Sequence, residues 1–391
     1  MVGAATANIF PPKHDLRLDN KNNHGINTTR MALSLPFLDG ASRKKRSQII
    51  AVDLGSRTTK AVLLERRGDT LALTRYAMLD APVHEKKLSV EQLAEHLRAV
   101  AAALGNATKH IALAVGVNDA LVKLVDLPQI PVGEMRQVLK MNHKNYLQQD
   151  LPNHVFDCYI MPPRVSAPNE KKAERTTGAN TKLKVMVAAG KQQLVTDFMQ
   201  AAAMAGLVVE GLIPGMIGPV NAFEQAFPEV YAKETVALVD IGFKQTTVCV
   251  VDRGELALNR LVNIGGDNLT VGLADAMNIS YAEAEGIKVG MAPEVETALQ
   301  LQVIPLGREI RASLDFFEHQ FDRPVTQVYL SGGSGRSEFV QQLLHSELTA
   351  ECKTWNPTGF LQLALPGQQA VEVEHVGPQL AVAIGTGLAV F

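Results

Sequence analysis

The sequence predicts an α/β protein whose two halves share one duplicated fold, with a smaller α/β subdomain inserted into the first half. Two stretches carry this prediction: VDLGSRTTKAVL, which begins at residue 52, and a closely similar stretch that begins at residue 236. In both, an apolar strand is followed by Asp-x-Gly, a polar tip, a second apolar strand, an Arg-Gly turn and a third strand. A repeat separated by about half the chain indicates two domains that each open with a three-stranded meander.

The first repeat begins with a strand that is expected to be central. Residues 49–52 form a short, unbroken apolar run, which is typical of a strand covered on both faces. Gly55 permits a tight reversal, after which the apolar residues 61–64 resume the sheet. The tip of this hairpin carries Asp53, Ser56, Thr58, Thr59 and Lys60. Hydroxyls and backbone donors can cradle a phosphate, with Lys60 as a cationic contact and Asp53 available to a metal's water shell. If this motif is considered alone, the alternative to a phosphate-binding loop is a polar hairpin that only reverses the chain.

A second tip and a glycine-rich turn strengthen the prediction of a ligand site. Asp240 occupies the position of Asp53 in the second repeat, so two such tips facing each other would hold a polyphosphate from both sides. Residues 328–344, VYLSGGSGRSEFVQQLL, predict a strand, a glycine-rich turn and a helix beginning near Ser337. Gly332 and Gly333 would let the backbone approach a flat ligand, and Arg336 could stack on an aromatic base.

In this order, the motifs resemble those of the actin and Hsp70 superfamily of ATP-binding proteins, and within it the PilM family of actin-like type IV pilus assembly proteins, which is close to FtsA. The resemblance covers residues 48–391 and implies an actin-like, ribonuclease H-like fold with ATP and Mg²⁺ as cofactors. It implies a first phosphate loop at Asp53, Gly55, Ser56, Thr58 and Lys60, a second at Asp240 and Gly242, a nucleoside contact at Glu285 and Lys288, and an adenosine loop at Gly332, Gly333, Ser334 and Arg336. Asp53 and Asp240 would reach the metal through water.

The resemblance also suggests a domain organisation. It implies a flexible tail at 1–47, a first domain at 48–232 with an insertion subdomain at about 121–212, and a second domain at 233–391. The second domain would contain a smaller subdomain at about 266–325 and a closing helix, within PQLAVAIGTGLAVF, that crosses back between the domains. Because a short apolar lead and a basic run precede the first strand, as in PilM, Met31 is a candidate for the native first residue; N-terminal sequencing would test this.

Composition agrees with such a protein. The chain has 391 residues, 46% of them hydrophobic, which is enough to bury the cores of two domains. A formal net charge of -2 argues against nucleic acid as a partner. Cys158, Cys249 and Cys352 are far apart without metal-ligand spacing, so we expect buried, reduced thiols and a cytoplasmic protein. No apolar run is long enough to span a bilayer, and the basic run at 43–46 is either a solvated tail or a contact for anionic lipid.

Two helices are predicted from capping signals. Residues 89–104 place apolar side chains on one face, with Ser89 and Gln92 as a capping box, and therefore predict a surface helix. Ser280 and Glu283 give the same signature for the helix that carries Glu285 and Lys288, so an ordinary i, i+3 ion pair is the alternative reading of those two residues. The polar stretch at 164–181 predicts a flexible hairpin loop.

The second phosphate loop departs from the family pattern. Phe243, Lys244 and Gln245 follow its Asp-x-Gly where small residues are usual. Large side chains there would narrow the pocket, whereas Lys244 would add a phosphate contact if it pointed inward. Asn221 and Gln225 match only loosely the residues that orient an attacking water. Because phosphoryl transfer depends on positioning, the sequence predicts nucleotide binding with weak or no hydrolysis.

The function that the resemblance implies is a cytoplasmic ATP-binding scaffold at the inner face of the inner membrane, in a type IV pilus or related secretion machinery. Its partner would be a PilN-like inner-membrane protein, bound through a short cytoplasmic N-terminal peptide near the insertion subdomain, so that membrane association is peripheral. Two alternatives share the fold: a small-molecule kinase and an FtsA-like filament-forming protein.

Overall fold

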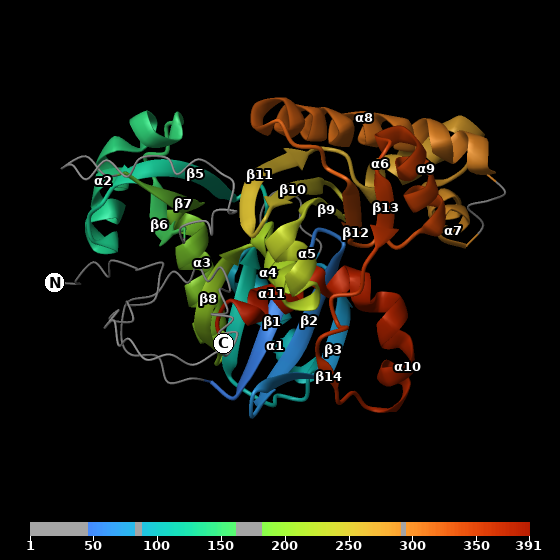
Figure 1. The fold of residues 1–391 in the computed structure, drawn as a ribbon. Helices are drawn as coiled ribbons and strands as arrows, with labels where there is room; N and C mark the ends of the chain where they lie inside the picture. Colours follow the sequence, from blue (N-terminus) through green and yellow to red (C-terminus); the bar gives the residue numbers. More distant parts are fainter. Residues whose placement is uncertain (1–45, 83–87, 162–181, 291–294) are drawn as a thin grey trace.

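The computed structural model describes residues 46–82, 88–161, 182–290 and 295–391, and Figure 1 shows them as two stacked sheets with a third, smaller sheet to one side. The first sheet has the strand order β14-β3-β2-β1-β4-β8. Strands β1 to β3 form the predicted antiparallel meander, and β4 joins β1 in parallel. The strands are β1 (Gln48–Leu54), β2 (Thr58–Arg67), β3 (Thr70–Asp80), β4 (His110–Val115), β8 (Val208–Pro214) and β14 (Gln362–Leu363).

The second sheet repeats this arrangement. Its order is β11-β10-β9-β12-β13, in which β9 to β11 form the second predicted meander and β12 pairs with β9 in parallel. Strands β1 and β9 lie inside their sheets and are buried on both faces, which explains their unbroken apolar runs. The strands are β9 (Thr235–Ile241), β10 (Thr246–Asp252), β11 (Glu255–Val262), β12 (Gln327–Ser331) and β13 (Glu351–Thr354).

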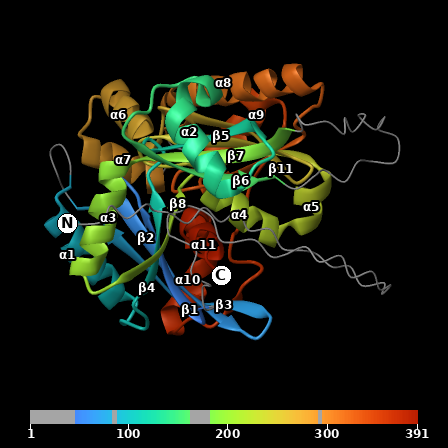
Figure 2. The ribbon, with the colours of Figure 1, turned by 90° about the vertical axis from the view of Figure 1, so that its left-hand side faces the viewer.

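The third sheet belongs to the inserted segment. Strands β5 (Ala120–Pro128), β7 (Lys182–Lys191) and β6 (His154–Ile160) are antiparallel neighbours, and α2 (Val132–Leu147) packs on them (Figure 2). The following α3 (Gln192–Met204) and β8 lie with the first sheet, because β8 pairs with β4. The separate sheet therefore ends at Lys191, earlier than the predicted limit near 212. The predicted loop at 164–181 and tail residues 1–45 lie outside the described residues.

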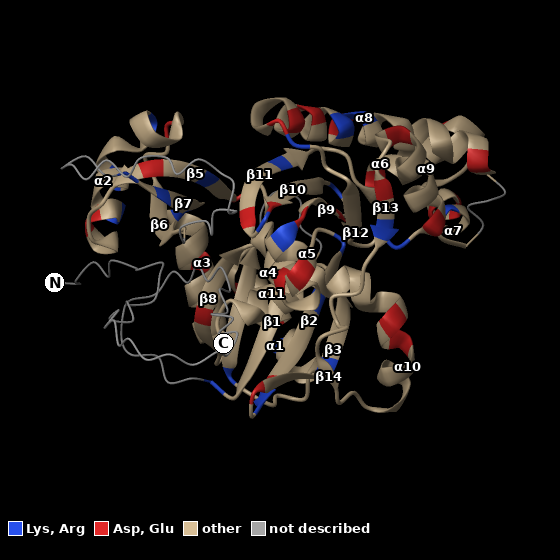
Figure 3. Ribbon diagram, viewed as in Figure 1, with Lys and Arg blue, Asp and Glu red and all other residues tan. Residues whose placement is uncertain are grey.

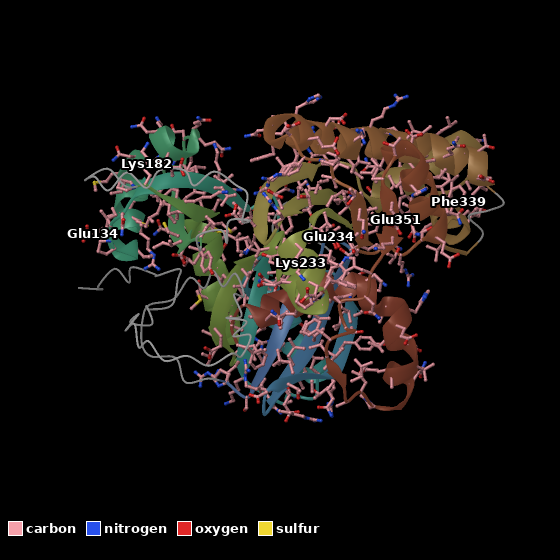
Figure 4. The ribbon with its side chains drawn as sticks, viewed as in Figure 1. Glu134, Lys182, Lys233, Glu234, Phe339 and Glu351 are labelled. Atoms are coloured by element: carbon pink, nitrogen blue, oxygen red, sulfur yellow. The ribbon has the colours of Figure 1, made fainter. Side chains whose placement is uncertain are left out.

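Helices fill the layers around the sheets. On the first sheet, α1 (Val90–Ala103) packs with α3, while α4 (Ile217–Ala226) and α11 (Ala381–Leu388) lie between the two large sheets. The second sheet is covered by α8 and α9. The remaining helices are α5 (Pro228–Lys233), α6 (Gly266–Met277), α7 (Tyr281–Gly290), α8 (Glu296–Phe321), α9 (Glu338–Leu348), α10 (Gly367–Val376) and the 3-10 helix η2 (Gly377–Leu380). Figure 4 shows side chains filling the layers, with Glu134 and Lys182 marking the inserted part and Phe339 and Glu351 the far side of the second sheet.

Several local predictions are confirmed. Ser89 caps α1 in a capping box with Gln92, and Ser337 caps α9. All three cysteines are buried and free. After β13 the chain returns to the first sheet, where β14 pairs with β3 and α11 packs against β1, so the C-terminal segment crosses between the halves. Within the described residues, no helix combines the length and apolarity needed to cross a membrane.

Candidate functional site between the two hairpins

The two Asp-x-Gly motifs lie in the hairpins β1–β2 and β9–β10, which bring opposite charges together between the large sheets. Asp53 ends β1, and its carboxylate Oδ2 lies 3.3 Å from the Nζ of Lys60 on β2. The register of the hairpin pairs these two residues directly across the strands. Both are close enough to Asp240, at the end of β9, to change its pKa: the Lys60 charge lowers it and the Asp53 charge raises it. Three of the predicted site residues therefore converge.

Asp240 is half-buried, as are Asp53 and Lys60. Burial raises the pKa of Asp240 to about 6, although a hydrogen bond from Ser331 Oγ, at 2.8 Å from Oδ2, favours the charged form. Ser331 ends β12, the parallel neighbour of β9, so the sheet register fixes this contact. A half-buried carboxylate that ionises near neutral pH is suited to binding a cation, which would compensate for the lost hydration.

Glu285 and Lys288 form a polar cluster with helix α6. Lys288 Nζ lies 2.7 Å from Glu285 Oε2 and donates to Thr270 Oγ1 at 2.6 Å and to the Gly266 carbonyl at 3.0 Å. Burial raises the pKa of Glu285, but hydrogen bonds from Lys288 and Thr270 outweigh it and the pKa falls below its usual range. The pKa of Lys288 is lowered, chiefly by burial. The i, i+3 pair thus exists, and it also ties α7 to α6.

The predicted adenosine loop, Gly332 to Arg336, lies beside the second hairpin. Gly332 has a φ of +87°, and a Cβ there would sit 2.5 Å from the Ile241 carbonyl oxygen, so only glycine fits this turn. Its N–H donates to the Pro378 carbonyl at 2.9 Å, and the Ser334 N–H donates to Ile241. Gly333 is exposed and Arg336 is half-buried. The loop therefore borders the site, with Gly333 open to solvent.

The three large residues of the second loop, Phe243, Lys244 and Gln245, all contact other side chains. Lys244 Nζ lies 2.6 Å from Asp267 Oδ2 at the start of α6, so it forms an ion pair within the second half. Gln245 exchanges two hydrogen bonds with Asn118, each 2.8 Å long. Asn118 belongs to the loop between β4 and β5, so this pair joins the two halves of the molecule.

Arg57 is a site residue that sequence reasoning missed. Its Nη1 lies 2.7 Å from Glu285 Oε1, and its guanidinium carbon lies 5.2 Å from the centre of the Phe243 ring. One side chain of the first loop thus contacts both the second loop and α7. The only signal for it in the sequence was an arginine among the small residues of GSRTTK. The family pattern assigns phosphate contacts to the hydroxyl residues of this stretch, so the arginine was not predicted as a site residue.

Some predicted residues do not join the cluster. Ser56 is exposed, and Thr59 is buried with its hydroxyl 2.8 Å from His96 Nε2 on α1, so it points away from the second hairpin. Gly55 and Gly242 shape the loops and Thr58 begins β2. Asn221, the loose candidate for orienting water, is buried in α4 and donates to the Gly385 carbonyl at 3.2 Å. It therefore has a packing role.

The donor set fits the cofactors that the sequence implied. Lys60 is a cation suited to a phosphate, and Asp53 and Asp240 can accept hydrogen bonds from the water shell of Mg²⁺. Within the described ranges there is no group of three or more His, Cys, Asp or Glu side chains that could hold a metal directly. Because Mg²⁺ usually keeps several waters, two carboxylates and phosphate oxygens are a sufficient set.

Comparison with known proteins now places the chain. A family model described as type IV pilus assembly protein PilM matches residues 51–391. This chain belongs to the PilM family. FtsA, a cell division protein of Bacillus subtilis (strain 168), is 22% identical over 363 residues, which cover 85% of this chain and 78% of FtsA.

Solved structures agree on the fold. A PilM-PilN type IV pilus biogenesis complex matches with a TM-score of 0.74 and 20% identity, covering 89% of this chain and 100% of that one. The ethanolamine utilization protein EutJ from Carboxydothermus hydrogenoformans matches with a TM-score of 0.51 and 16% identity, covering 88% and 90%. The predicted actin-like fold is confirmed, and the PilM family places the chain among type IV pilus assembly proteins.

Proposed function

We propose that this PilM-family chain binds ATP with Mg²⁺ between its two Asp-x-Gly hairpins and acts as a cytoplasmic scaffold of type IV pilus assembly. The observation that carries the proposal is the convergence of Lys60, Asp53 and Asp240, which come from both halves of the molecule. A ligand held by both halves stabilises their closed arrangement, because it binds that arrangement better than an open one. Bound nucleotide would therefore fix the shape that a partner meets.

The first test is calorimetric titration of the full chain with ATP and Mg²⁺. We expect saturable binding by the wild type and a loss of at least about tenfold in affinity for Asp53→Asn, because the carboxylate that accepts from the metal's water shell is removed. Asp69→Asn is the matched control, since Asp69 is exposed in the turn between β2 and β3. Equal affinity in Asp53→Asn and the wild type would contradict the assignment, as would no binding at all.

Hydrolysis is proposed to be slow or absent. Phe243 stands in the second loop where family members carry small residues, and Lys244 is paired with Asp267. Asn221, inside α4, donates a hydrogen bond to the Gly385 carbonyl. Since phosphoryl transfer depends on positioning an attacking group, this arrangement supports binding over turnover. Phosphate release that depended on an added sugar or carboxylic acid would instead favour a small-molecule kinase.

The proposed partner is a PilN-like inner-membrane protein, bound through its short cytoplasmic N-terminal peptide. Support comes from the matched structure, which is a PilM-PilN complex and is covered over its whole length. Such a partner would hold the chain at the inner face of the membrane. Titration with a synthetic partner peptide, with and without ATP, tests both the contact and its dependence on nucleotide. ATP-dependent pelleting without a partner would favour an FtsA-like filament.

A further inference from the structure

One edge of the first sheet is only partly paired. Strand β3 pairs with β2 along its whole length, but β14 covers the opposite edge only at Ala72 and Leu73. Beyond Leu73, helix α10 lies next to this edge (Figure 1), and Gln369 on α10 contacts Tyr76. Exposed strand edges present backbone donors and acceptors that can pair with another chain.

The side chain of Gln369 on α10 already imitates a neighbouring strand at one point of this edge. Its Nε2 donates to the Tyr76 carbonyl at 2.8 Å, and its Oε1 accepts from the Tyr76 N–H at 3.4 Å. The Ala81 N–H donates to the Arg57 carbonyl on the β2 side. Because the backbone groups of successive residues point to opposite edges of a strand, those of Tyr76, Met78 and Asp80 point to the edge away from β2. Met78 and Asp80 share the parity of Tyr76, and both are exposed. Within the described residues, neither backbone has a hydrogen-bond partner on this edge.

An open pocket of about 400 Å³ adjoins this edge. Its lining combines strand, α1 and α10: Tyr76, Ala77, Met78, Leu79, Ala103, Gln369, Glu372 and Val376. Most of these side chains are apolar, and none belongs to the candidate nucleotide site. The pocket is thus suited to one or two aliphatic side chains of a chain lying along β3.

One charged side chain, that of Glu372, is among the residues that line the pocket. Glu372 lies on α10, which carries acidic residues in Figure 3, and Asp80 is the last residue of β3. The pocket lining contains no Lys or Arg. Burial, followed by the Glu372 charge, raises the pKa of Tyr76, and both residues line the pocket. A complementary ligand would therefore carry a basic residue next to its apolar one.

We propose that the edge of β3 from Tyr76 to Asp80 is a docking site for an extended segment of a partner protein. The segment adds a strand whose backbone pairs with Met78 and Asp80, puts an aliphatic side chain into the pocket and sets a lysine or arginine against Glu372. A second copy of this chain fits less well, because pairing two identical edges would bring Glu372 and Asp80 of both copies together. The proposal is independent of nucleotide binding.

The test selects heptapeptides from a displayed random library on the immobilised full chain. We expect enrichment of sequences that alternate aliphatic or β-branched residues and carry Lys or Arg. Synthetic versions should bind Glu372→Lys at least about tenfold more weakly than the wild type, because the charge contact becomes repulsive. Glu374→Lys is the matched control: it makes the same charge change two residues away on α10, outside the pocket, and should bind within about twofold of the wild type. Enriched peptides that treat both variants alike, or no enrichment, would overturn the proposal.

Hydrogen exchange of the β3 segment identifies the occupant. In the free chain, the Met78 amide should exchange rapidly, and saturating peptide should slow it at least about tenfold, since a strand partner protects the amide. Protection already present in the free chain at every protein concentration would mean that the chain's own residues cover the edge. Protection that grows with protein concentration, together with a dimer in sedimentation, would mean that a second copy does. Either result overturns the proposal of a separate partner.

Discussion

At the scale of single residues, we expect the charge on Asp240 to control how well the proposed site holds a cation. Because burial raises its pKa to about 6, the carboxyl is largely neutral at pH 5 and largely ionised at pH 7. Affinity for the Mg²⁺ complex of ATP should therefore rise through this range. We expect Asp240→Asn to bind about tenfold more weakly at pH 7 and to differ little at pH 5.

Calorimetry at pH 5, 6 and 7 measures this effect. Since a terminal phosphate also titrates near pH 6, the wild type alone gives no clear answer, and the difference between the wild type and Asp240→Asn is the quantity to follow. Parallel pH profiles for the two proteins would show that Asp240 does not contact the bound complex.

Glu224 on α4 gives a second residue-scale prediction, about stability. Burial raises its pKa to about 8, and its Oε2 has no hydrogen-bond partner within the described residues. A carboxyl with a raised folded-state pKa stabilises the fold below its unfolded pKa, and that contribution is lost as pH rises through about 8. Glu224→Gln should therefore be more stable than the wild type at pH 9, by about 2 kcal/mol, and nearly equal at pH 5.

Urea unfolding at the two pH values checks this difference. Glu229→Gln is a suitable control, because Glu229 on the neighbouring α5 is exposed and pairs only with Lys233 among the described residues. A gain for Glu224→Gln that is the same at pH 5 and pH 9 would point to packing and not to the charge.

At the scale of elements, the contact between α4 and α11 holds the middle layer together. A Cβ on Gly385 would lie 1.7 Å from the Gly218 carbonyl oxygen, so the two backbones touch. Gly385→Ala must push the helices apart, and we expect a loss of about 2–3 kcal/mol in unfolding free energy. In Gly286→Ala, the new Cβ on α7 meets nothing within 4 Å. That control should be neutral or slightly stabilising, since alanine is the better helix former. Thermal unfolding of both variants measures this difference. Equal stability of Gly385→Ala and Gly286→Ala would contradict a close contact between α4 and α11.

Elements also show where sequence reasoning succeeds. Both meanders follow from local signals, because the apolar period and the Gly turns lie within about thirty residues and the two copies support each other. The place of β8 could not be read from local signals for the opposite reason: it lies in the first sheet because it pairs with β4, which is about 100 residues earlier in the chain. Arg57 was missed because its partners, Phe243 and Glu285, come from the other half. Non-local pairing leaves little trace in a single sequence.

At the scale of the whole molecule, the two halves meet through contacts of two kinds. Phe223 of α4 packs edge-on against Tyr329 and Trp355 of the second half, with ring centres 4.6 and 5.3 Å apart. Polar pairs join the halves elsewhere: Arg57 with Glu285, Asn118 with Gln245, and Lys184 with Glu255. Apolar burial is the stronger contribution, and polar pairs in which one partner is exposed to solvent, as in all three of these, are weak. We therefore expect the aromatic cluster to persist while the polar pairs open and close.

The pair between Arg57 and Glu285 provides the test of this view. Its side chains are 45% and 18% exposed, so its loss should cost little global stability. Since it joins the first hairpin to α7, Arg57→Ala should raise hydrogen exchange in both segments together, by about threefold, while the strands around Phe223 keep their protection. Arg67→Ala removes a similarly exposed pair, with Glu65 on the same strand, and should leave α7 unchanged. A change confined to the hairpin would mean that Arg57 does not couple the two halves.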